Sequence, residues 1–189
     1  LVVRCAWPRD DLMMDYHDHE WGVPAHDDRL LFEHLVLDGA QAGLSWRTIL
    51  NKRENYRLAF DNFDLEKVAG YGGRKIETLL QDAGIVRNRK KIESAIKNAQ
   101  VSIAIQEKFG SLDAYFWEFV RGKTIVNSWK KLSDVPTTSL ESDALSKDLK
   151  GRGMAFVGST IMYAMMQAAG LVNDHIVRCF RHKQLVEFS

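Results

Sequence analysis

Apolar side chains recur at intervals of three and four residues over two segments in the first third of the chain, 30–37 and 46–50. This spacing predicts two amphipathic helices, because residues three and four apart lie on the same face of a helix. Asp27 precedes the first segment and can cap its N-terminus, while Gly39 and Gly43 mark the break before the second. The first third of the chain is therefore expected to be helical.

The same periodicity returns in five later segments, each with a glycine near its boundary. We expect helices at 76–80, 90–109, 113–120, 142–149 and 161–169. Alternation of apolar and polar residues with a period of two is nearly absent, so the pattern gives little support to strands. The least regular stretch, 123–140, is expected to be a long surface loop. The fold class predicted from the pattern is all-α.

Length and composition narrow the class of protein further. With 189 residues, the chain has the usual size of a single domain. Its formal net charge of +1 decides nothing about a polyanionic partner, so local clusters of charge have to be considered. Only two cysteines occur, and there is no signal-peptide pattern and no apolar run of about 18 residues. We therefore expect a cytoplasmic protein without a membrane role.

Each of the two cysteines has a histidine near it in the sequence. Cys5 and His17 lie near the N-terminus, and His175 and Cys179 lie near the C-terminus. The second pair is four residues apart, which on a helix places both side chains on one face, where they can share a metal ion. Spacing alone leaves open that these are two unrelated buried thiols and two ordinary histidines. If all four residues bind one zinc ion, its shell is closed and its role is structural rather than catalytic.

Three of the five tryptophans are concentrated between residues 7 and 46, among several acidic residues. Trp7, Tyr16, Trp21 and Trp46 can belong to a helical core, as most such residues do. They can equally form an aromatic cage that stacks on a flat heterocycle, in which a carboxylate accepts a hydrogen bond from an exocyclic amine. A cationic ring would gain further stabilisation from the indole faces.

A glycine-containing loop follows Asp38, which we place at the end of the first predicted helix. The loop carries Gln41, Gly43 and Leu44, and its glycine allows the backbone to approach another molecule closely. Leu44 or Gln41 can then insert into a stack of bases. Leu44 can also fold back onto the core, and Asp38 can be a helix cap or a solvated acid. The pattern does not decide between these interpretations.

Two helices joined by a tight turn are predicted by the motif LLQDAGIVRNRKKIESAIK. Gly84 lies in the turn, and the second helix is expected to begin near Asn88. A turn at a helix N-terminus presents backbone N–H groups to an anion. Arg87, Arg89 and Lys90 add a local excess of positive charge. The turn and the basic cluster together indicate contacts with the backbone of duplex DNA.

Several motifs of the chain resemble those of the 3-methyladenine DNA glycosylase I family, within the helix-hairpin-helix glycosylase superfamily. They span nearly the whole chain and are YHDHEWGVP (16–24), QAGLSW (41–46), KRENYRLAF (52–60), DAGIVRNRKKI (82–92), SDALSKDLKGRGMAFVGSTI (142–161) and QAAGLVNDH (167–175). The resemblance implies an all-α helix-hairpin-helix glycosylase fold in a single domain, 1–189. The N- and C-terminal segments would together form a zinc-binding lobe, and residues 60–125 roughly the helix-hairpin-helix lobe.

The same resemblance implies roles for the candidate residues. It implies one structural zinc ion bound by Cys5, His17, His175 and Cys179. It implies a base pocket lined by Trp7, Tyr16, Trp21 and Trp46. It also implies that the loop with Gln41, Gly43 and Leu44 wedges into the duplex, and that the acid at position 38 recognises the base.

Two positions depart from the pattern of the family or its superfamily. Where this chain has Asp38, family members carry a glutamate that is taken to recognise the alkylated adenine. The aspartate is shorter by one methylene group, a shift of about 1.5 Å, and a misplacement of that order can lower a rate by about a hundredfold. Val86 stands where the superfamily turn usually has its second glycine, which predicts a less typical grip on phosphate.

The activity implied by the resemblance is hydrolysis of the N-glycosidic bond of 3-methyladenine in alkylated duplex DNA, which leaves an abasic site. Because the methylated base is positively charged, it leaves readily. The expected partner is duplex DNA containing alkylated adenine, and we expect a monomer with no nucleotide cofactor. Two alternatives stay open: a catalytically weakened protein that binds alkylation damage on the same fold, and a metalloenzyme that uses zinc as a Lewis acid.

Overall fold

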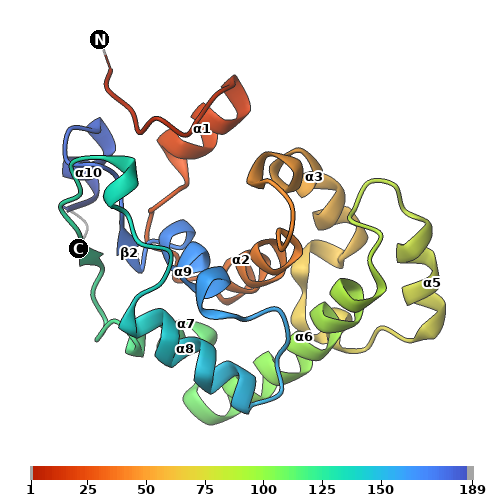
Figure 1. Ribbon diagram of the computed structural model, residues 1–189. Coiled ribbons are helices and arrows are strands. Elements are labelled where there is room, and N and C mark those ends of the chain that lie inside the picture. Colours follow the sequence, from red (N-terminus) through yellow and green to blue (C-terminus); the bar gives the residue numbers. More distant parts are fainter. Residues whose placement is uncertain (1, 187–189) are drawn as a thin grey trace.

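In the computed structural model, residues 2–186 are described, and Leu1 and 187–189 lie outside the described residues. The described chain is mostly helical (Figure 1). Its helices are α1 (Asp11–His19), α2 (Asp28–Ala40), α3 (Trp46–Ala59), α4 (Leu65–Ala69), α5 (Gly73–Gln81), α6 (Arg89–Phe109), α7 (Leu112–Glu118), α8 (Leu140–Gly151), α9 (Ser159–Ala168) and α10 (Phe180–Val186). Between them lie the 3₁₀ turns η1 (Asp61–Phe63) and η2 (Leu132–Asp134) and the strands β1 (Ile125–Val126) and β2 (Val172–Asn173). No helix within residues 2–186 has the length and hydropathy to cross a membrane.

Side-chain caps begin several of these helices where the sequence predicts a start. Asp27 accepts a hydrogen bond from the backbone N–H of Leu30 and begins α2, as expected. Asn88 caps α6 in the same way through the N–H of Lys91, and Ser45 caps α3. Such caps satisfy N–H groups that have no partner within the helix, and each stabilises a helix by about 1 kcal/mol. All seven helices expected from the periodicity are present.

The core is organised around α2, which is buried from Leu31 to its end at Ala40. This helix contacts α3, α6, α7 and α9. In Figure 1 it lies at the centre of the molecule, with α3, α5 and α6 on one side and α1 and α10 on the other. A helix without a polar face needs such a central position, because it can be stable only when it is covered all round. Its last turn carries Asp38 into the interior of the molecule.

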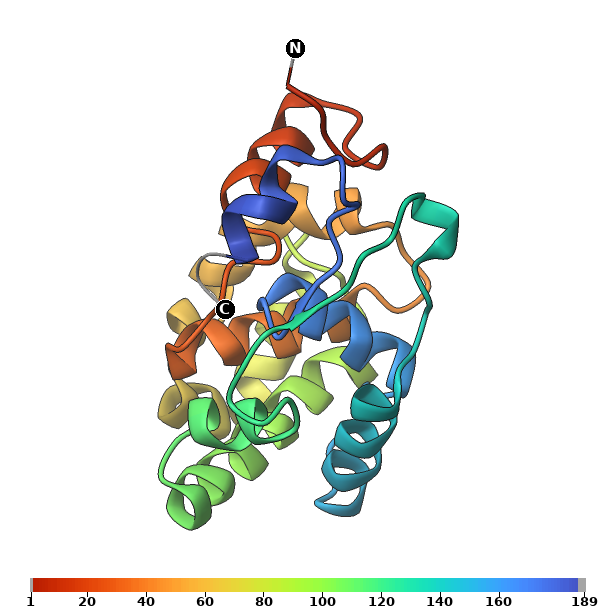
Figure 2. The ribbon, with the colours of Figure 1, turned by 90° about the vertical axis from the view of Figure 1, so that its left-hand side faces the viewer.

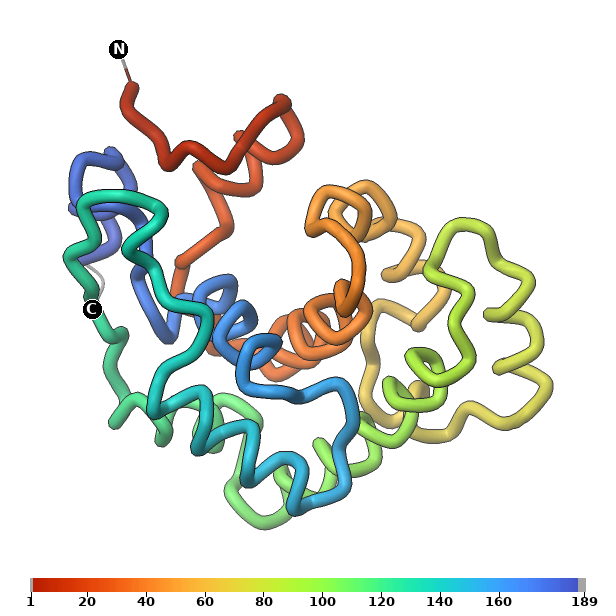
Figure 3. The backbone as a smooth tube through the Cα atoms, in the orientation of Figure 1, coloured from red at the N-terminus to blue at the C-terminus, as the bar shows by residue number. Residues whose placement is uncertain are grey.

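The two ends of the chain lie side by side. In Figure 3 the chain begins at the left, passes through the helices at the right and the bottom, and ends at the left again. The segment before α1 and the segment around α10 are adjacent in both ribbon views (Figures 1 and 2). A backbone hydrogen bond from Phe180 N to Val3 O (2.9 Å) joins them directly. Cys5 and Cys179, far apart in the sequence, are brought together in this way.

The all-α expectation is correct for the main architecture but omits one small sheet. β1 and β2 pair in parallel, with Ile125 opposite Val172 and Val126 opposite Asn173. Each strand has only two residues, which is too short for an alternation of polar and apolar residues to be visible in the sequence. The expected surface loop 123–140 therefore contains β1 and η2, and α8 begins at its end.

Three short helices and one local conformation differ from the expectation. The periodicity does not predict α1, α4 or α10, because each buries few side chains: Tyr16 and His17 in α1, Val68 in α4, and Leu185 in α10. His175 and Cys179 do not share a helical face, since both lie in the turn between β2 and α10. The residues from His175 to Cys179 therefore form a non-helical turn, and this turn brings the two side chains together.

Gly170 permits a close approach between the segment after α9 and the segment before α2. Its φ is +73°, and a Cβ at this position would overlap the backbone of Val23 and Pro24. We expect Gly170→Ala to lower the free energy of unfolding by more than about 2 kcal/mol, because it combines a strained φ with a clash against immovable backbone. Urea denaturation followed by circular dichroism measures the difference.

Gly110→Ala is the matched control, because Gly110 also has a positive φ (+92°) but no atom within 4 Å of the added Cβ. It should lose only the conformational contribution, about 1 kcal/mol. Equal losses in the two variants would contradict the role of Gly170 in this close approach.

Candidate active site

A cavity of about 330 Å³ opens between α1, α2, the start of α3, α9 and the region of η2. It is lined by all five residues that the sequence predicts for base binding: Trp7, Tyr16, Trp21, Asp38 and Trp46. Gln41, from the loop after α2, lines it as well. Cavities that bind small molecules have volumes of about 300–1,000 Å³ and mostly apolar walls. The size and lining of this cavity therefore suit one small, largely flat molecule.

The aromatic side chains around the cavity contact one another at an angle rather than in a flat stack. The ring centres of Trp7 and Trp21 lie 5.2 Å apart with their planes at 71°, and those of Tyr16 and Trp46 lie 5.3 Å apart at 43°. Tilted contacts of this kind are favourable because the positive edge of one ring meets the negative face of another. The rings belong both to the packing and to the cavity wall, so the two interpretations that the sequence allowed do not exclude each other.

Three polar atoms of the cavity-lining side chains are buried without a hydrogen-bond partner within the described part of the chain. They are Trp7 Nε1, Asp38 Oδ2 and Trp46 Nε1. A buried polar group without a partner costs on the order of 1–3 kcal/mol, and few such groups occur in folded proteins. Two unpaired donors and one unpaired acceptor around the same cavity indicate a ligand whose own polar atoms would complete these bonds.

Asp38 lies in the last turn of α2, with only 4% of its surface exposed. Burial raises the pKa of its carboxyl group to about 8, and the nearby charge of Arg53 opposes this shift only in part. The neutral, protonated form of Asp38 is therefore favoured at neutral pH. Asp38 is neither a helix cap nor a solvated acid, because α2 continues to Ala40 and the side chain is buried.

Arg53 does not neutralise Asp38, because two glutamates already engage its guanidinium group. Its Nε donates to Glu33 (2.6 Å), and its Nη1 donates to Glu20 (2.6 Å). His34 adds no positive charge, since burial, reinforced by Arg53, lowers the pKa of its imidazole to about 4. The carboxyl group of Asp38 is thus left available for a group that enters the cavity.

The loop after α2 presents Leu44 to solvent beside the cavity. Leu44 is 41% exposed, which is inconsistent with the alternative in which it packs into the core, and Gly43 turns the chain with a φ of +77°. Lys91 of α6 holds this loop, because its Nζ donates to the backbone carbonyls of Ala40 (2.8 Å) and Ala42 (2.6 Å). A cation is favourable at this C-terminal end of α2. No feature of the sequence distinguishes Lys91 from its basic neighbours, so its role was not predicted.

The turn between α5 and α6 has the predicted form, but its backbone N–H groups already have partners. Gly84 N donates to Asp82 Oδ1 (2.7 Å), and Val86 N donates to the hydroxyl of Tyr56 (3.1 Å). The carboxylate of Asp82 occupies the position at which a phosphate would accept a bond from Gly84. A phosphate that used these groups would have to replace partners that the protein itself supplies.

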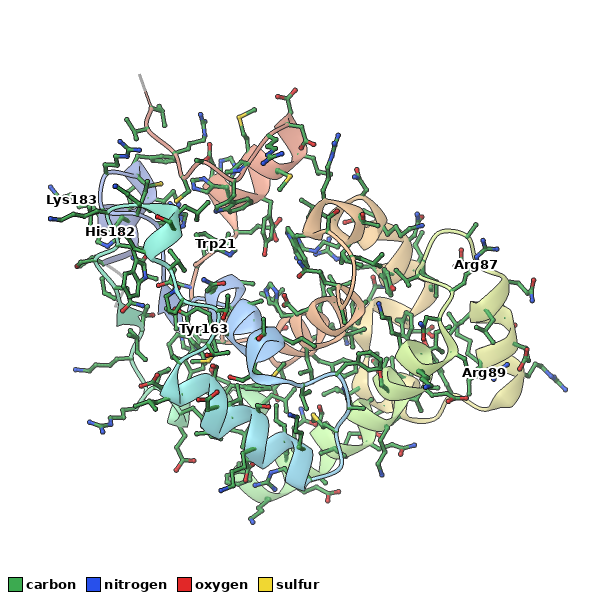
Figure 4. The ribbon with its side chains drawn as sticks, in the orientation of Figure 1. Trp21, Arg87, Arg89, Tyr163, His182 and Lys183 are labelled. Atoms are coloured by element: carbon green, nitrogen blue, oxygen red, sulfur yellow. The ribbon has the colours of Figure 1, made fainter. Side chains whose placement is uncertain are left out.

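The basic cluster beyond this turn is exposed and lies away from the cavity. Arg87, Arg89 and Lys90 are all exposed, and Arg89 pairs with Glu77 (2.6 Å). Figure 4 shows Arg87 and Arg89 at the right of the view, whereas the cavity residue Trp21 lies to the left. The structure therefore does not gather the predicted DNA contacts into one small site, and only an extended partner can reach both regions.

The four predicted metal ligands meet at one point. Cys5, His17, His175 and Cys179 are buried, and their ligand atoms all lie within 4.8 Å of one another. Cys179 Sγ lies 3.5 Å from His175 Nδ1 and 3.6 Å from His17 Nε2. The Cys5 thiol and the two imidazoles lower the pKa of Cys179, which favours the thiolate form that binds metals. The two cysteine–histidine pairs form a single cluster with the donor set of a tetrahedral metal site.

Hydrogen bonds outside the cluster orient both of its histidines. His17 Nδ1 donates to Asp18 (2.8 Å), which is held in turn by Arg4 (2.7 Å), and His175 Nε2 donates to the carbonyl oxygen of Trp21 (2.9 Å). Metal-binding histidines typically have such outer partners, which fix the ring and its protonation. Because the ring of Trp21 lines the cavity, this residue connects the cluster with the cavity.

The cavity has a further wall that the sequence analysis did not predict. It is formed by Leu132 and Val135, at and after η2, by Gln167 of α9, and by Asp174, which follows β2. Leu132 and Val135 lie in the expected surface loop, where no periodicity marks them. Asp174 could have been noticed only as the neighbour of His175, a predicted metal ligand.

Comparison with known proteins places the chain in a family. The methyladenine glycosylase family model matches residues 6–182. DNA-3-methyladenine glycosylase 1 of Escherichia coli K12 is 50% identical over 177 residues, which cover 93% of this chain and 95% of that protein. DNA-3-methyladenine glycosylase of Haemophilus influenzae Rd is 44% identical over 180 residues, which cover 95% of this chain and 97% of that protein.

A solved structure agrees with these matches. The crystal structure of a tyrosine-to-phenylalanine variant of 3-methyladenine DNA glycosylase I in complex with 3-methyladenine is similar to this chain with a TM-score of 0.91. The two are 38% identical, and the alignment covers 94% of this chain and 96% of that one. The resemblance indicated by the sequence motifs is confirmed, and this chain belongs to the methyladenine glycosylase family.

Proposed function

We propose that this chain removes 3-methyladenine from alkylated duplex DNA by hydrolysing the N-glycosidic bond, which leaves an abasic site. The observation that carries the proposal is the cavity lined by four aromatic rings and one buried, unpaired carboxyl group. The relatives from Escherichia coli and Haemophilus influenzae are named for the same activity. A protein of the same fold has been solved with 3-methyladenine bound.

The aromatic wall of the cavity suits a base that is flat and positively charged. Methylation at N3 places a positive charge on adenine while its glycosidic bond is intact. Indole and phenol faces attract a cation above them by about 0.5–2 kcal/mol, and more as water is excluded. Trp7 and Trp46 also offer unpaired indole N–H groups to acceptors on the base. Undamaged adenine carries no such charge and gains less from these rings.

Asp38 supplies the negative partner of the base. Its unpaired Oδ2 accepts a hydrogen bond from the exocyclic amine, and a cation beside it favours the ionised carboxyl group. Binding of the charged base therefore favours release of the proton from Asp38. A neutral base offsets less of the cost of an ionised carboxylate in this buried position, because only the hydrogen bond from its amine remains. Selection of the damaged base thus rests on charge as well as on shape.

Hydrolysis of this glycosidic bond requires little of the protein beyond extruding the nucleotide and holding the base. The charged base is a good leaving group, so its bond to deoxyribose can break through an oxocarbenium-like transition state before water attacks fully. A protein that flips the nucleotide out of the duplex and binds the departing base tightly lowers this barrier. We assign no general base to the reaction.

Leu44 and Gln41 are suited to fill the space that the flipped nucleotide leaves in the duplex. Leu44 is an exposed apolar side chain at the tip of a loop, as in proteins that wedge apart stacked bases. Lys91 fixes the backbone of this loop through Ala40 and Ala42, so the wedge is presented in one position. A rigid wedge loses less conformational entropy when it inserts into the duplex.

The rest of the expected interface is also part of this proposal. We propose one domain with two lobes, in which the chain ends form the metal-binding lobe and residues of about 60–125 form the helix-hairpin-helix lobe. The hairpin is α5 and α6, with Gly84 in its turn, and its exposed basic residues contact DNA phosphates: Arg87, Arg89 and Lys90. The protein acts on duplex DNA as a monomer.

The shorter acid at position 38 does not favour the alternative of a damage-binding protein without activity. Asp38 still lines the cavity and keeps its carboxyl group free of partners. A Lewis-acid mechanism has less support still, because four protein ligands close the metal cluster and leave no position for a reacting water.

Substitutions at Asp38 test the proposed function. We expect Asp38→Asn to lower the rate of 3-methyladenine release by at least about tenfold, since a hydrogen bond to a charged group contributes about 1.5–3 kcal/mol. Asp38→Glu should preserve or raise the rate, because it restores the family's acid. Chromatography of bases released from methylated DNA measures both rates, with unmodified DNA as the control substrate.

Two outcomes of this assay count against the account. Wild-type protein that binds methylated DNA but releases no base would favour the damage-binding alternative. A marked loss of activity in Asp38→Glu would show that the cavity is shaped for the shorter side chain and that the proposed role of position 38 is wrong.

We further propose that the metal is zinc and that its role is structural. Zinc bonds of about 2.3 Å to sulfur and 2.0–2.1 Å to nitrogen place neighbouring ligands of a tetrahedral site about 3.5 Å apart. The sulfur–nitrogen distances of 3.5, 3.6 and 3.7 Å in the cluster fit this arrangement. Because the ligands come from both ends of the chain, one ion would join the two ends and hold the N-terminal wall of the cavity in place.

We expect about one zinc ion per chain by elemental analysis, and a fall in Tm of roughly 10 °C or more when a strong chelator removes it, because structural zinc sites contribute several kcal/mol to folding. Glycosylase activity should fall together with the folded fraction. An unchanged Tm with complete loss of activity would contradict a structural role and support the Lewis-acid alternative.

A further inference from the structure

Two carboxyl groups line the cavity, and their surroundings are opposite. Asp38 keeps one oxygen without any partner, whereas Asp174, only 1% exposed, accepts four hydrogen bonds. These come from Asn127 Nδ2 (2.7 Å), Trp129 Nε1 (2.7 Å), Tyr163 Oη (2.6 Å) and Gln167 Nε2 (2.9 Å). A carboxylate has about four acceptor positions. Asp174 therefore has none left for a ligand, and any effect on the base is exerted through the residues that it holds.

The two-stranded sheet brings the first of these donors to Asp174. Because Val126 lies opposite Asn173 in a parallel register, the residues that follow the strands, Asn127 and Asp174, leave the sheet at the same edge. Asn127 N donates to Asn173 O (3.2 Å) and extends the pairing by one more bond. The sheet ends here, because each strand has only two residues. Beyond its end, side-chain hydrogen bonds to Asp174 join the two segments that follow the strands.

Residues 127–135, which we call the strap, run from this point along the cavity. Figures 1 and 2 show the strap beside the C-terminal segment that carries Asp174. Trp129 anchors it twice, through its indole N–H to Asp174 and through its carbonyl oxygen, which accepts from Val177 N (2.9 Å). Beyond this anchor, Leu132 and Val135 line the cavity, although Leu132 is 41% exposed. The position of this wall therefore depends on the anchor at its start.

The other oxygen of Asp174 holds α9. Tyr163 and Gln167 lie one helical turn apart on the same face of α9, and both donate to Asp174 Oδ2. Gln167 also lines the cavity. One carboxylate thus joins the strap, α9 and the turn that carries the metal ligand His175.

We propose that Asp174 is a positioning residue, whose carboxylate fixes the strap and α9 as one wall of the cavity and thereby sets how tightly the cavity closes on the base. This inference rests on the proposed function. Dispersion contacts weaken steeply when a gap of less than 1 Å opens between two surfaces, so a wall that moves away from the base loses affinity for it. A loosened strap also admits water beside the charged base.

Trp129→Phe tests this tether, because it removes the indole N–H and keeps an aromatic ring in place. Trp117→Phe is the matched control: it also removes one indole N–H bond, from Trp117 Nε1 to the backbone carbonyl of Ala25 (2.9 Å), at a residue that does not line the cavity. The readouts are the Kd for free 3-methyladenine by calorimetry and the hydrogen exchange of residues 127–135 by mass spectrometry. We expect Trp129→Phe to weaken binding by up to about tenfold, less than the full contribution of one hydrogen bond to a charged group, because this bond acts on the base only through the strap. Exchange in the strap should rise in this variant alone.

A second variant keeps the test decisive if aromatic packing compensates for the lost bond. Asp174→Asn replaces an acceptor oxygen with a donor and should weaken binding more than Trp129→Phe, with the metal content unchanged. Equal binding and equal strap exchange in wild type and both variants would overturn the proposal. So would a loss of affinity in Trp117→Phe as large as that in Trp129→Phe. If wild-type protein neither binds nor releases the methylated base, the proposed function fails, and unchanged strap exchange in Trp129→Phe would separately show that the tether is absent.

Discussion

A carboxyl group buried without a hydrogen-bond partner is the constraint on which the rest of this site depends. α2 carries Asp38 into an apolar, aromatic cavity, where ionisation is costly and the pKa rises to about 8. The surrounding charges do not relieve that cost, because Glu20 and Glu33 engage Arg53 and burial keeps His34 neutral. The cavity consequently favours a molecule that brings its own positive charge and hydrogen-bond donor.

The cluster of Cys5, His17, His175 and Cys179 matters to this cavity because it joins the C-terminal segment to the segment that supplies half of the aromatic wall. Trp7 and Tyr16 lie between Cys5 and His17 in the sequence, and Trp21 follows shortly after. The carbonyl oxygen of Trp21 orients His175, and its ring lines the cavity. Residues at the two ends of the chain are thus linked through the same side chains that would contact the base. Stability of the fold and shape of the site are coupled at this point.

The sequence predicted those features that depend on local pattern or on residue chemistry. Helical periodicity located α2 and α6, and the scarcity of cysteine directed attention to the four candidate metal ligands. The pattern did not predict β1 or β2, because strands of two residues are specified by contacts with distant parts of the chain. Lys91 and Asp174 were missed for the same reason: their partners, Ala40 and Trp129, lie about fifty residues away. That Asp38 lies inside α2, facing a cavity, required the structure.

The pKa of Asp38 is the most direct test of this account. A ¹³C NMR titration of the aspartate carboxyl carbons, with the signal of Asp38 assigned by its absence from Asp38→Asn, measures it in the free protein and with 3-methyladenine bound. We predict a value of about 8 in the free protein and a lower one in the complex, because a hydrogen bond from the base favours the ionised form. An ordinary value in the free protein, or one that the base does not change, would contradict the central role of this buried carboxyl group.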